Sequence, residues 1–117
     1  MTPRYRDGEL LEHMLAAIAK IHRYIGASSE DAFMANELVQ DGVLRNLEII
    51  GEAVSKLSLE CRQAHQDVPW GEIAGMRNRL IHGYMSVNLQ IVWDTVQEVL
   101  PKFRSQIRAI AHTLPKT

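Results

Sequence analysis

The apolar residues of this chain recur every three to four positions over nearly its whole length, and this period constrains the fold most strongly. The clearest stripe runs from Leu10 to Ile25, and Gly26 stands where a left-handed residue would end that helix. A period near 3.6 puts such residues on one face of a helix, whereas a strand needs an alternation that no segment shows. The sequence therefore predicts an all-α protein built as an up-and-down helical bundle.

A second stripe predicts a long central helix, which follows a short capped one. Ser28 and Ser29 stand before two acids, an order typical of a helix start, so a short helix is expected around Phe33. The stripe of the long helix consists of Val43, Leu47, Ile50, Val54 and Leu57.

Three residues within this long helix need an explanation. Gly51 lowers the stability of the helix by roughly 1 kcal/mol relative to alanine, so we expect another backbone to approach it closely. Asn46 and Glu52 are polar, and the simplest expectation is that both face solvent. A catalytic role for Glu52 stays open.

The C-terminal half is predicted to contain two further helices. Residues 58–68 are polar and broken, and Pro69 and Trp70 then open a helix that Gly83 is expected to end. Asn88 is a suitable cap for the last helix, which Pro101 should kink or divide. The stripe of this last helix consists of Leu89, Trp93, Val96, Leu100, Phe103, Ile107 and Ile110.

Size and composition exclude several classes of protein. The chain has 117 residues, of which 46% are hydrophobic, and residues 1–117 are expected to form one domain. A chain this short would gain stability from a partner subunit. The net charge of −1 argues against coating nucleic acid through bulk charge. One cysteine, no apolar leader and no apolar run of ~20 residues favour a cytoplasmic protein outside the membrane.

The densest group of titratable residues lies between Arg77 and Tyr84. On a continuous helix Asn78 and His82 would be one turn apart on the same face, and Arg77 is long enough to reach back to them. Gly83 would release the backbone so that Tyr84 could fold beside the same site. A compact site made of arginine, asparagine and histidine is therefore feasible.

Simpler explanations compete with this site and with a second candidate. Basic residues near a helix C-terminus are favoured by the helix dipole without any function, and on spacing alone this explanation is the commoner one. Cys61 and His65 have a helical spacing that could bind zinc, but a structural site needs four ligands. His13, His22 and His112 are expected to be ordinary surface or boundary histidines. No metal and no cofactor is expected.

Two longer segments carry a resemblance to a known family. They are residues 44–53 of the long helix and residues 68–84, which include the Arg77 to Tyr84 group. Val87 and residues 91–93 continue the same pattern. Over nearly its whole length the sequence resembles the HepT family of the HEPN superfamily.

This resemblance implies an all-helical homodimer whose two motifs face each other across a cleft and cleave RNA without a metal ion. Such proteins are toxins of toxin–antitoxin pairs. The partner implied is an MntA-type nucleotidyltransferase antitoxin, which silences the toxin by transferring AMP to the motif tyrosine, here Tyr84.

The residue types suit this chemistry. His82 can accept or donate a proton near neutral pH, and Arg77 can bind phosphate oxygens in a bidentate fork. Asn78 and Arg79 are expected to support substrate binding. The substrate, tRNA or mRNA, stays open. So do two other functions: a non-catalytic partner of a nucleotidyltransferase, and a nucleotide-binding module.

Overall fold

The protein consists of helices that alternate in direction. The computed structural model describes residues 3–82 and 86–114, and it describes only the backbone of residues 3–5 and 82. The helices are α1 (Pro3–Ile25), α2 (Glu30–Met34), α3 (Glu37–Lys56), α4 (Leu59–Ala64), α5 (Trp70–Ala74), α6 (Met76–Leu80), α7 (Leu89–Asp94), the π-helical η1 (Thr95–Val99) and α8 (Leu100–Thr113). A small hairpin joins β1 (Ile81–His82) to β2 (Ser86–Val87).

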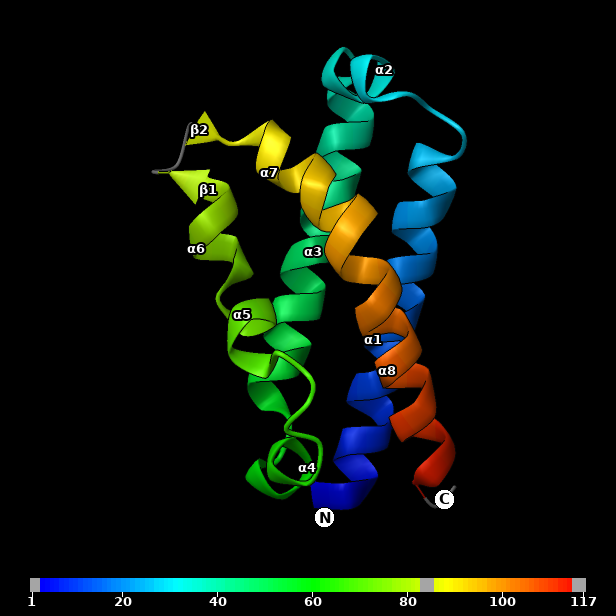
Figure 1. The fold of residues 1–117 in the computed structure, drawn as a ribbon, viewed down its shortest axis with the longest axis vertical. Helices are drawn as coiled ribbons and strands as arrows, with labels where there is room; N and C mark the ends of the chain where they lie inside the picture. The colour runs from blue at the N-terminus through cyan, green and yellow to red at the C-terminus, as the bar shows by residue number, and fades with distance from the viewer. Residues whose placement is uncertain (1–2, 83–85, 115–117) are drawn as a thin grey trace.

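The direction of these runs confirms the predicted up-and-down bundle. In Figure 1, α1 rises, α3 returns, α5 and α6 rise again, and α7 and α8 descend. The all-α class is likewise confirmed, because the only strands in the described ranges are the two short ones of the hairpin.

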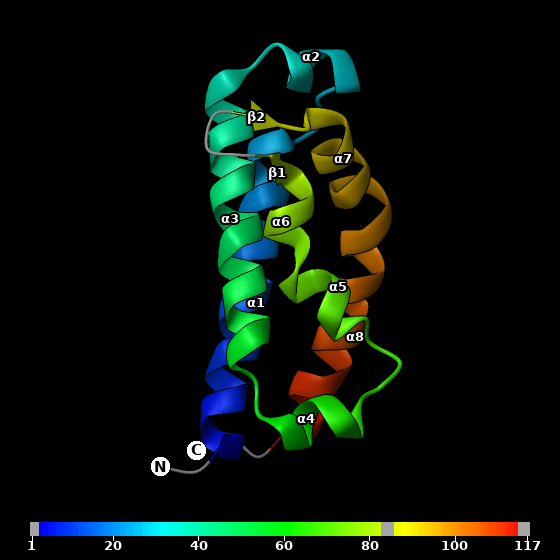
Figure 2. The same cartoon turned by 90° about the vertical axis from the view of Figure 1, so that its left-hand side faces the viewer.

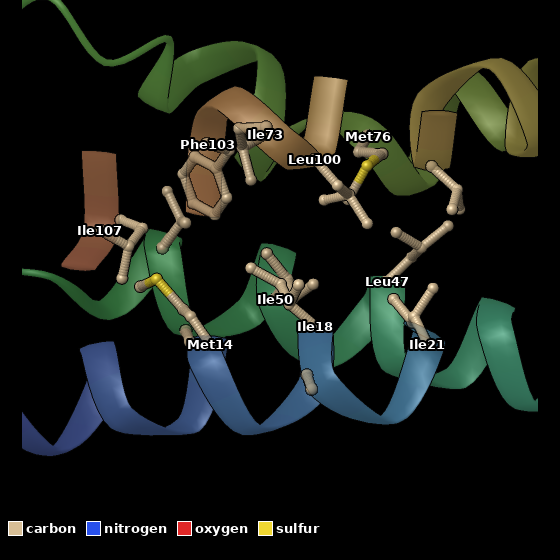
Figure 3. Packing of buried hydrophobic residues seen from close by; sticks show 14 of the residues in the cluster. Met14, Ile18, Ile21, Leu47, Ile50, Ile73, Met76, Leu100, Phe103 and Ile107 are labelled. Carbon is tan, nitrogen blue, oxygen red and sulfur yellow. The ribbon is translucent and has the colours of Figure 1, made fainter. Parts of the chain in front are cut away.

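The core lies between α1, α3 and the C-terminal helices, and it holds α5 and α6 against α3. Figure 3 shows this packing, in which apolar side chains from all these helices meet. The labelled buried residues are Met14, Ile18, Ile21, Leu47, Ile50, Ile73, Met76, Leu100, Phe103 and Ile107. Each such side chain contributes roughly 1.5–3 kcal/mol through burial, so the face of α3 that meets α6 is firmly held.

Gly51 lies where the backbone of α3 packs closely against that of α5, which confirms the predicted backbone approach. A Cβ atom at this position would lie 3.3 Å from the carbonyl oxygen of Ile73 and 3.5 Å from that of Ala74. The glycine therefore permits a contact between two helices that alanine would crowd.

Asn46 is buried, with 4% of its surface exposed, so the expectation that it faces solvent is wrong. Its Nδ2 donates a hydrogen bond to the carbonyl oxygen of Gly42 at 2.8 Å, one turn earlier in α3. This local bond lets the amide be buried at little cost. Glu52 is exposed, as expected.

The segment expected to be broken contains the short helix α4. Ser58 caps it, because its Oγ accepts a hydrogen bond from the backbone N–H of Cys61 at 3.0 Å. The same hydroxyl donates to Asp7 of α1 at 2.6 Å. A contact 51 residues away in sequence thus fixes this turn, and local sequence patterns do not reveal it.

The last helix begins and divides as predicted. Asn88 caps α7 by accepting a hydrogen bond from the N–H of Ile91 at 3.1 Å. The π-helical turn η1 ends two residues before Pro101, and the N–H of Leu100 donates to the carbonyl oxygen of Thr95, five residues back. Proline lacks an N–H and its ring crowds the preceding turn, which accounts for the division here.

Three histidines lie on the outer faces of α1 and α8. His13 and His22 on α1 and His112 on α8 are exposed, which confirms their reading as surface histidines. Within the described ranges, no helix combines the length and the apolar character needed to cross a lipid bilayer.

Candidate functional site

Three consecutive polar residues of α6 form an exposed face. Met76 and Leu80 are one helical turn apart, and both are buried in the core. This anchoring turns Arg77, Asn78 and Arg79 outward, where all three are exposed. The helix therefore presents two cations and an amide to solvent, while its opposite side is buried in the core.

The predicted helix from Trp70 to Gly83 is interrupted at Gly75 and ends at Leu80. Gly75 separates α5 from α6, and a Cβ atom added at this position would lie 3.2 Å from the carbonyl oxygen of Gly71. The prediction that Gly83 ends the helix is wrong, since the chain leaves the helix before that residue. Gly83 itself lies outside the described residues.

A hydrogen bond across the hairpin explains where α6 ends. The N–H of Asn88 donates to the carbonyl oxygen of Leu80 at 2.8 Å, so this carbonyl is used outside the helix. Ile81 then pairs with Val87, and His82 with Ser86, in antiparallel register. Figure 2 shows the hairpin continuing from α6 at the end of the bundle near α2 and α7.

His82 therefore lies on a strand, and the predicted helical face shared by Asn78 and His82 does not exist. The hairpin begins directly after α6, so the backbone of His82 lies just beyond the exposed face that carries Arg77. Tyr84, the predicted modification site, lies outside the described residues. The convergence of the Arg77 and His82 side chains stays a prediction.

Glu48 of α3 is a site residue that the sequence patterns did not single out. Its Oε2 lies 3.6 Å from Nε of Arg77, and the side chains are 34% and 65% exposed, respectively. Glu48 precedes Gly51 by three residues, so it lies near the face of α3 that approaches α5. An acid one turn before an interior glycine was the available signal, but its partner became clear only in three dimensions.

Cys61 is poorly suited to act as a nucleophile or a zinc ligand. The thiol is buried, and its pKa is raised to about 11, first by burial and then by the negative charge of Asp7. The helix α4 ends at Ala64, so His65 is not on the same helical face as Cys61. In residues 3–82 and 86–114, no three histidine, cysteine, aspartate or glutamate residues are grouped as metal ligands would be.

Comparison with known proteins places the chain in a family. The family model described as "Ribonuclease HepT-like" matches residues 14–110. The chain belongs to the HepT-like ribonuclease family. Its match covers α3, α6 and the hairpin, the elements that carry Glu48, Arg77 and His82.

Several relatives of this HepT-like chain carry ribonuclease names. A candidate RNase of Caldanaerobacter subterraneus subsp. tengcongensis is 45% identical over 86% of this chain and 89% of its own length. A protein named probable ribonuclease HepT from Thermococcus cleftensis is 32% identical over 87% of this chain and 93% of its own.

A larger relative has a second activity in its name. A gamma-glutamylcyclotransferase and candidate RNase of Methanocaldococcus jannaschii is 39% identical over 91% of this chain, which spans only 48% of that protein. No solved structure matches the chain significantly.

Proposed function

We propose that this HepT-like protein is an endoribonuclease that cleaves RNA without a metal ion, with Arg77 and His82 as its catalytic pair. The observation that carries this proposal is the position of Arg77. Its guanidinium is exposed on a helix anchored in the core, and the strand of His82 begins directly after that helix. Membership of the HepT-like ribonuclease family supports RNA as the substrate.

The reaction needs no group from outside the protein. The 2′-hydroxyl of RNA attacks the adjacent phosphorus, a bond forms from O2′ to phosphorus, and the bond to O5′ breaks. His82 can accept the proton of the 2′-hydroxyl or supply one to the departing 5′-oxygen, because an unperturbed histidine titrates at ~6.5. Arg77 binds the phosphate oxygens and stabilises the charge that builds up on them. The products are a 2′,3′-cyclic phosphate and a 5′-hydroxyl.

A homodimer would supply the second histidine and the additional arginines that one chain lacks. A single His82 cannot readily act as base and acid in the same step, whereas a two-fold groove would bring two such residues to one phosphate. Arg77 and Arg79 of both protomers would also gather positive charge locally, which a chain of net charge −1 otherwise lacks.

The family context extends the proposal to a toxin controlled by an antitoxin. In this scheme an MntA-type nucleotidyltransferase transfers AMP to Tyr84: the phenolic oxygen attacks the α-phosphate of ATP, and pyrophosphate leaves. The added phosphodiester would bring a negative charge and a bulky group beside Arg77, and would thereby repel and block RNA. Asn78 and Arg79 are proposed to contact the substrate.

RNA cleavage by defined variants tests the proposal. Purified wild-type protein, Arg77→Ala and His82→Ala are incubated with total RNA in the presence of a chelator. We expect cleavage by the wild type and a loss of about 100-fold or more in each variant, because each removes a group that acts in the transition state. Arg108→Ala, which removes an exposed arginine from α8, is the matched control and should keep full activity.

Two outcomes would overturn the proposal. Cleavage that survives both substitutions, or that needs a divalent ion, contradicts the catalytic pair. A wild-type dimer that leaves RNA intact but accepts AMP on Tyr84 would instead identify a non-catalytic partner of a nucleotidyltransferase, and tight ATP binding without cleavage would identify a nucleotide-binding module.

A further inference from the structure

The ion pair between Glu48 and Arg77 joins α3 to α6 at the proposed catalytic arginine. We infer that Glu48 is the positioning residue that orients Arg77 toward the phosphate of the RNA. This inference rests on the proposed function, and it assigns Glu48 no contact with the substrate.

The contact uses one edge of the guanidinium. Glu48 Oε2 approaches Nε, the inner nitrogen of Arg77, at 3.6 Å. A guanidinium held at this edge can still offer its two terminal nitrogens to a phosphate, which binds best through a pair of parallel hydrogen bonds. The pair therefore leaves the phosphate-binding end of Arg77 available.

The stability of the fold does not explain why this ion pair is present. The Arg77 side chain is 65% exposed and that of Glu48 is 34% exposed. Ion pairs this accessible to water contribute little to folding, because solvent screens them and two long side chains lose freedom. Restricting the orientation of a flexible arginine is a role that such a pair can perform, because catalysis depends strongly on the placement of reacting groups.

Glu48 lies on α3, which is the longer of the two helices. Its neighbour Leu47 is buried in the core, and three residues later Gly51 brings α3 against α5. The short helix α6 is anchored through Met76 and Leu80. The ion pair therefore connects Arg77 to a long helix whose position does not depend on the hairpin that follows α6.

An acid beside a phosphate-binding arginine also has a cost, and this cost separates positioning from a merely structural role. Glu48 lowers the local positive potential and so weakens the attraction of RNA. Its removal should therefore leave RNA binding unchanged or stronger while it slows the chemical step. The expected signature is a lower kcat with an unchanged or lower KM.

Glu48→Gln and Glu52→Gln form a matched pair for this test. Both remove one negative charge from α3, and Glu52 lies one turn after Glu48 and is exposed. We expect Glu48→Gln to lower kcat about tenfold and Glu52→Gln to change it less than about twofold, since only the former releases Arg77. Equal kcat values for the two variants, or a faster Glu48→Gln enzyme, would overturn the inference.

Arg77→Lys shows whether Glu48 acts through Arg77. Lysine keeps the positive charge but has no Nε, so the orienting contact is already lost in this variant. Adding Glu48→Gln to Arg77→Lys should then lower kcat by less than about twofold, because residues that act as one unit give non-additive effects. A full additional tenfold loss would show that Glu48 acts elsewhere.

A readout without RNA separates this inference from the proposed nuclease activity. The Nε–Hε signal of Arg77 in NMR spectra of the free protein, assigned by its absence in Arg77→Lys, reports the motion of the guanidinium. We expect restricted motion in the wild type and in Glu52→Gln, and averaged motion in Glu48→Gln. The same motion in all three proteins overturns the positioning role, whereas absent cleavage with the expected NMR pattern would overturn only the nuclease.

Discussion

Asp7 connects the beginning of α1 to the beginning of α4 through Ser58. Asp7 is 3% exposed, and its carboxylate accepts hydrogen bonds from the backbone N–H of Ser58 at 2.9 Å and from the Ser58 hydroxyl at 2.6 Å. Replacing Asp7 with alanine leaves these donors without their buried acceptor.

Asp7→Ala is expected to lower the free energy of unfolding by about 1–3 kcal/mol, because buried hydrogen-bonding groups are costly to leave unpaired. Urea denaturation measures this loss. Glu12→Ala removes an exposed acid from the same helix and should change stability by less than about 0.5 kcal/mol. Equal effects of the two substitutions would contradict the role of Asp7.

The buried thiol of Cys61 predicts a loss of stability at alkaline pH. Its pKa is raised from 9.0 to about 11, first by burial and then by Asp7. Above pH 9.0 the unfolded thiol loses its proton while the folded one keeps it, so the stabilisation is complete below pH 9.0 and is lost as the pH rises toward 11. The free energy of unfolding should fall more steeply in the wild type than in Cys61→Ala over this range. Parallel curves would show that the thiol is not shifted.

At the scale of elements, helical periodicity predicted the main helices, while residue type predicted the cap at Asn88 and the division near Pro101. The cost of a glycine inside a long helix likewise predicted the close approach at Gly51. These local signals failed where contacts between different elements decide the structure. The end of α6 depends on the bond from Asn88 to Leu80, and the pairing of Glu48 with Arg77 depends on the packing of α3 against α6.

Two glycines in helices should respond in opposite ways to substitution. Nothing lies within 4 Å of a Cβ added at Gly8 in α1, whereas at Gly51 it would meet the Ile73 carbonyl oxygen at 3.3 Å. Gly8→Ala is expected to stabilise the protein by about 0.5–1 kcal/mol through helix propensity. Gly51→Val should destabilise it by about 1–3 kcal/mol through overpacking. Thermal or urea unfolding compares the two, and a neutral Gly51→Val would contradict the close packing of α3 on α5.

At the scale of the whole molecule, the central prediction is a groove shared by two protomers. The resemblance implied this homodimer, and the exposed face of α6 with the adjoining hairpin is where we propose the two copies meet. The candidate residues of this site could be identified from the sequence, because the chemistry of a side chain follows from its residue type. The sequence could not predict their arrangement, because His82 lies on a strand paired with Ser86.

Mixed dimers test whether the groove is shared. A dimer of one wild-type and one His82→Ala protomer, purified through two different tags, retains a single His82. If one phosphate needs both histidines, its activity should fall to far below half that of the wild-type dimer, to about a tenth or less. Activity close to half would show that each protomer cleaves RNA independently.

The chemical ends of the RNA products test the proposed mechanism most directly. Wild-type protein cleaves a defined RNA oligonucleotide in the presence of a chelator, and mass spectrometry identifies the groups on both fragments. Cleavage by Arg77 and His82 through the 2′-hydroxyl predicts a 2′,3′-cyclic phosphate on one fragment and a 5′-hydroxyl on the other. A 5′-phosphate with a 3′-hydroxyl, or no product until a divalent ion is added, would contradict it.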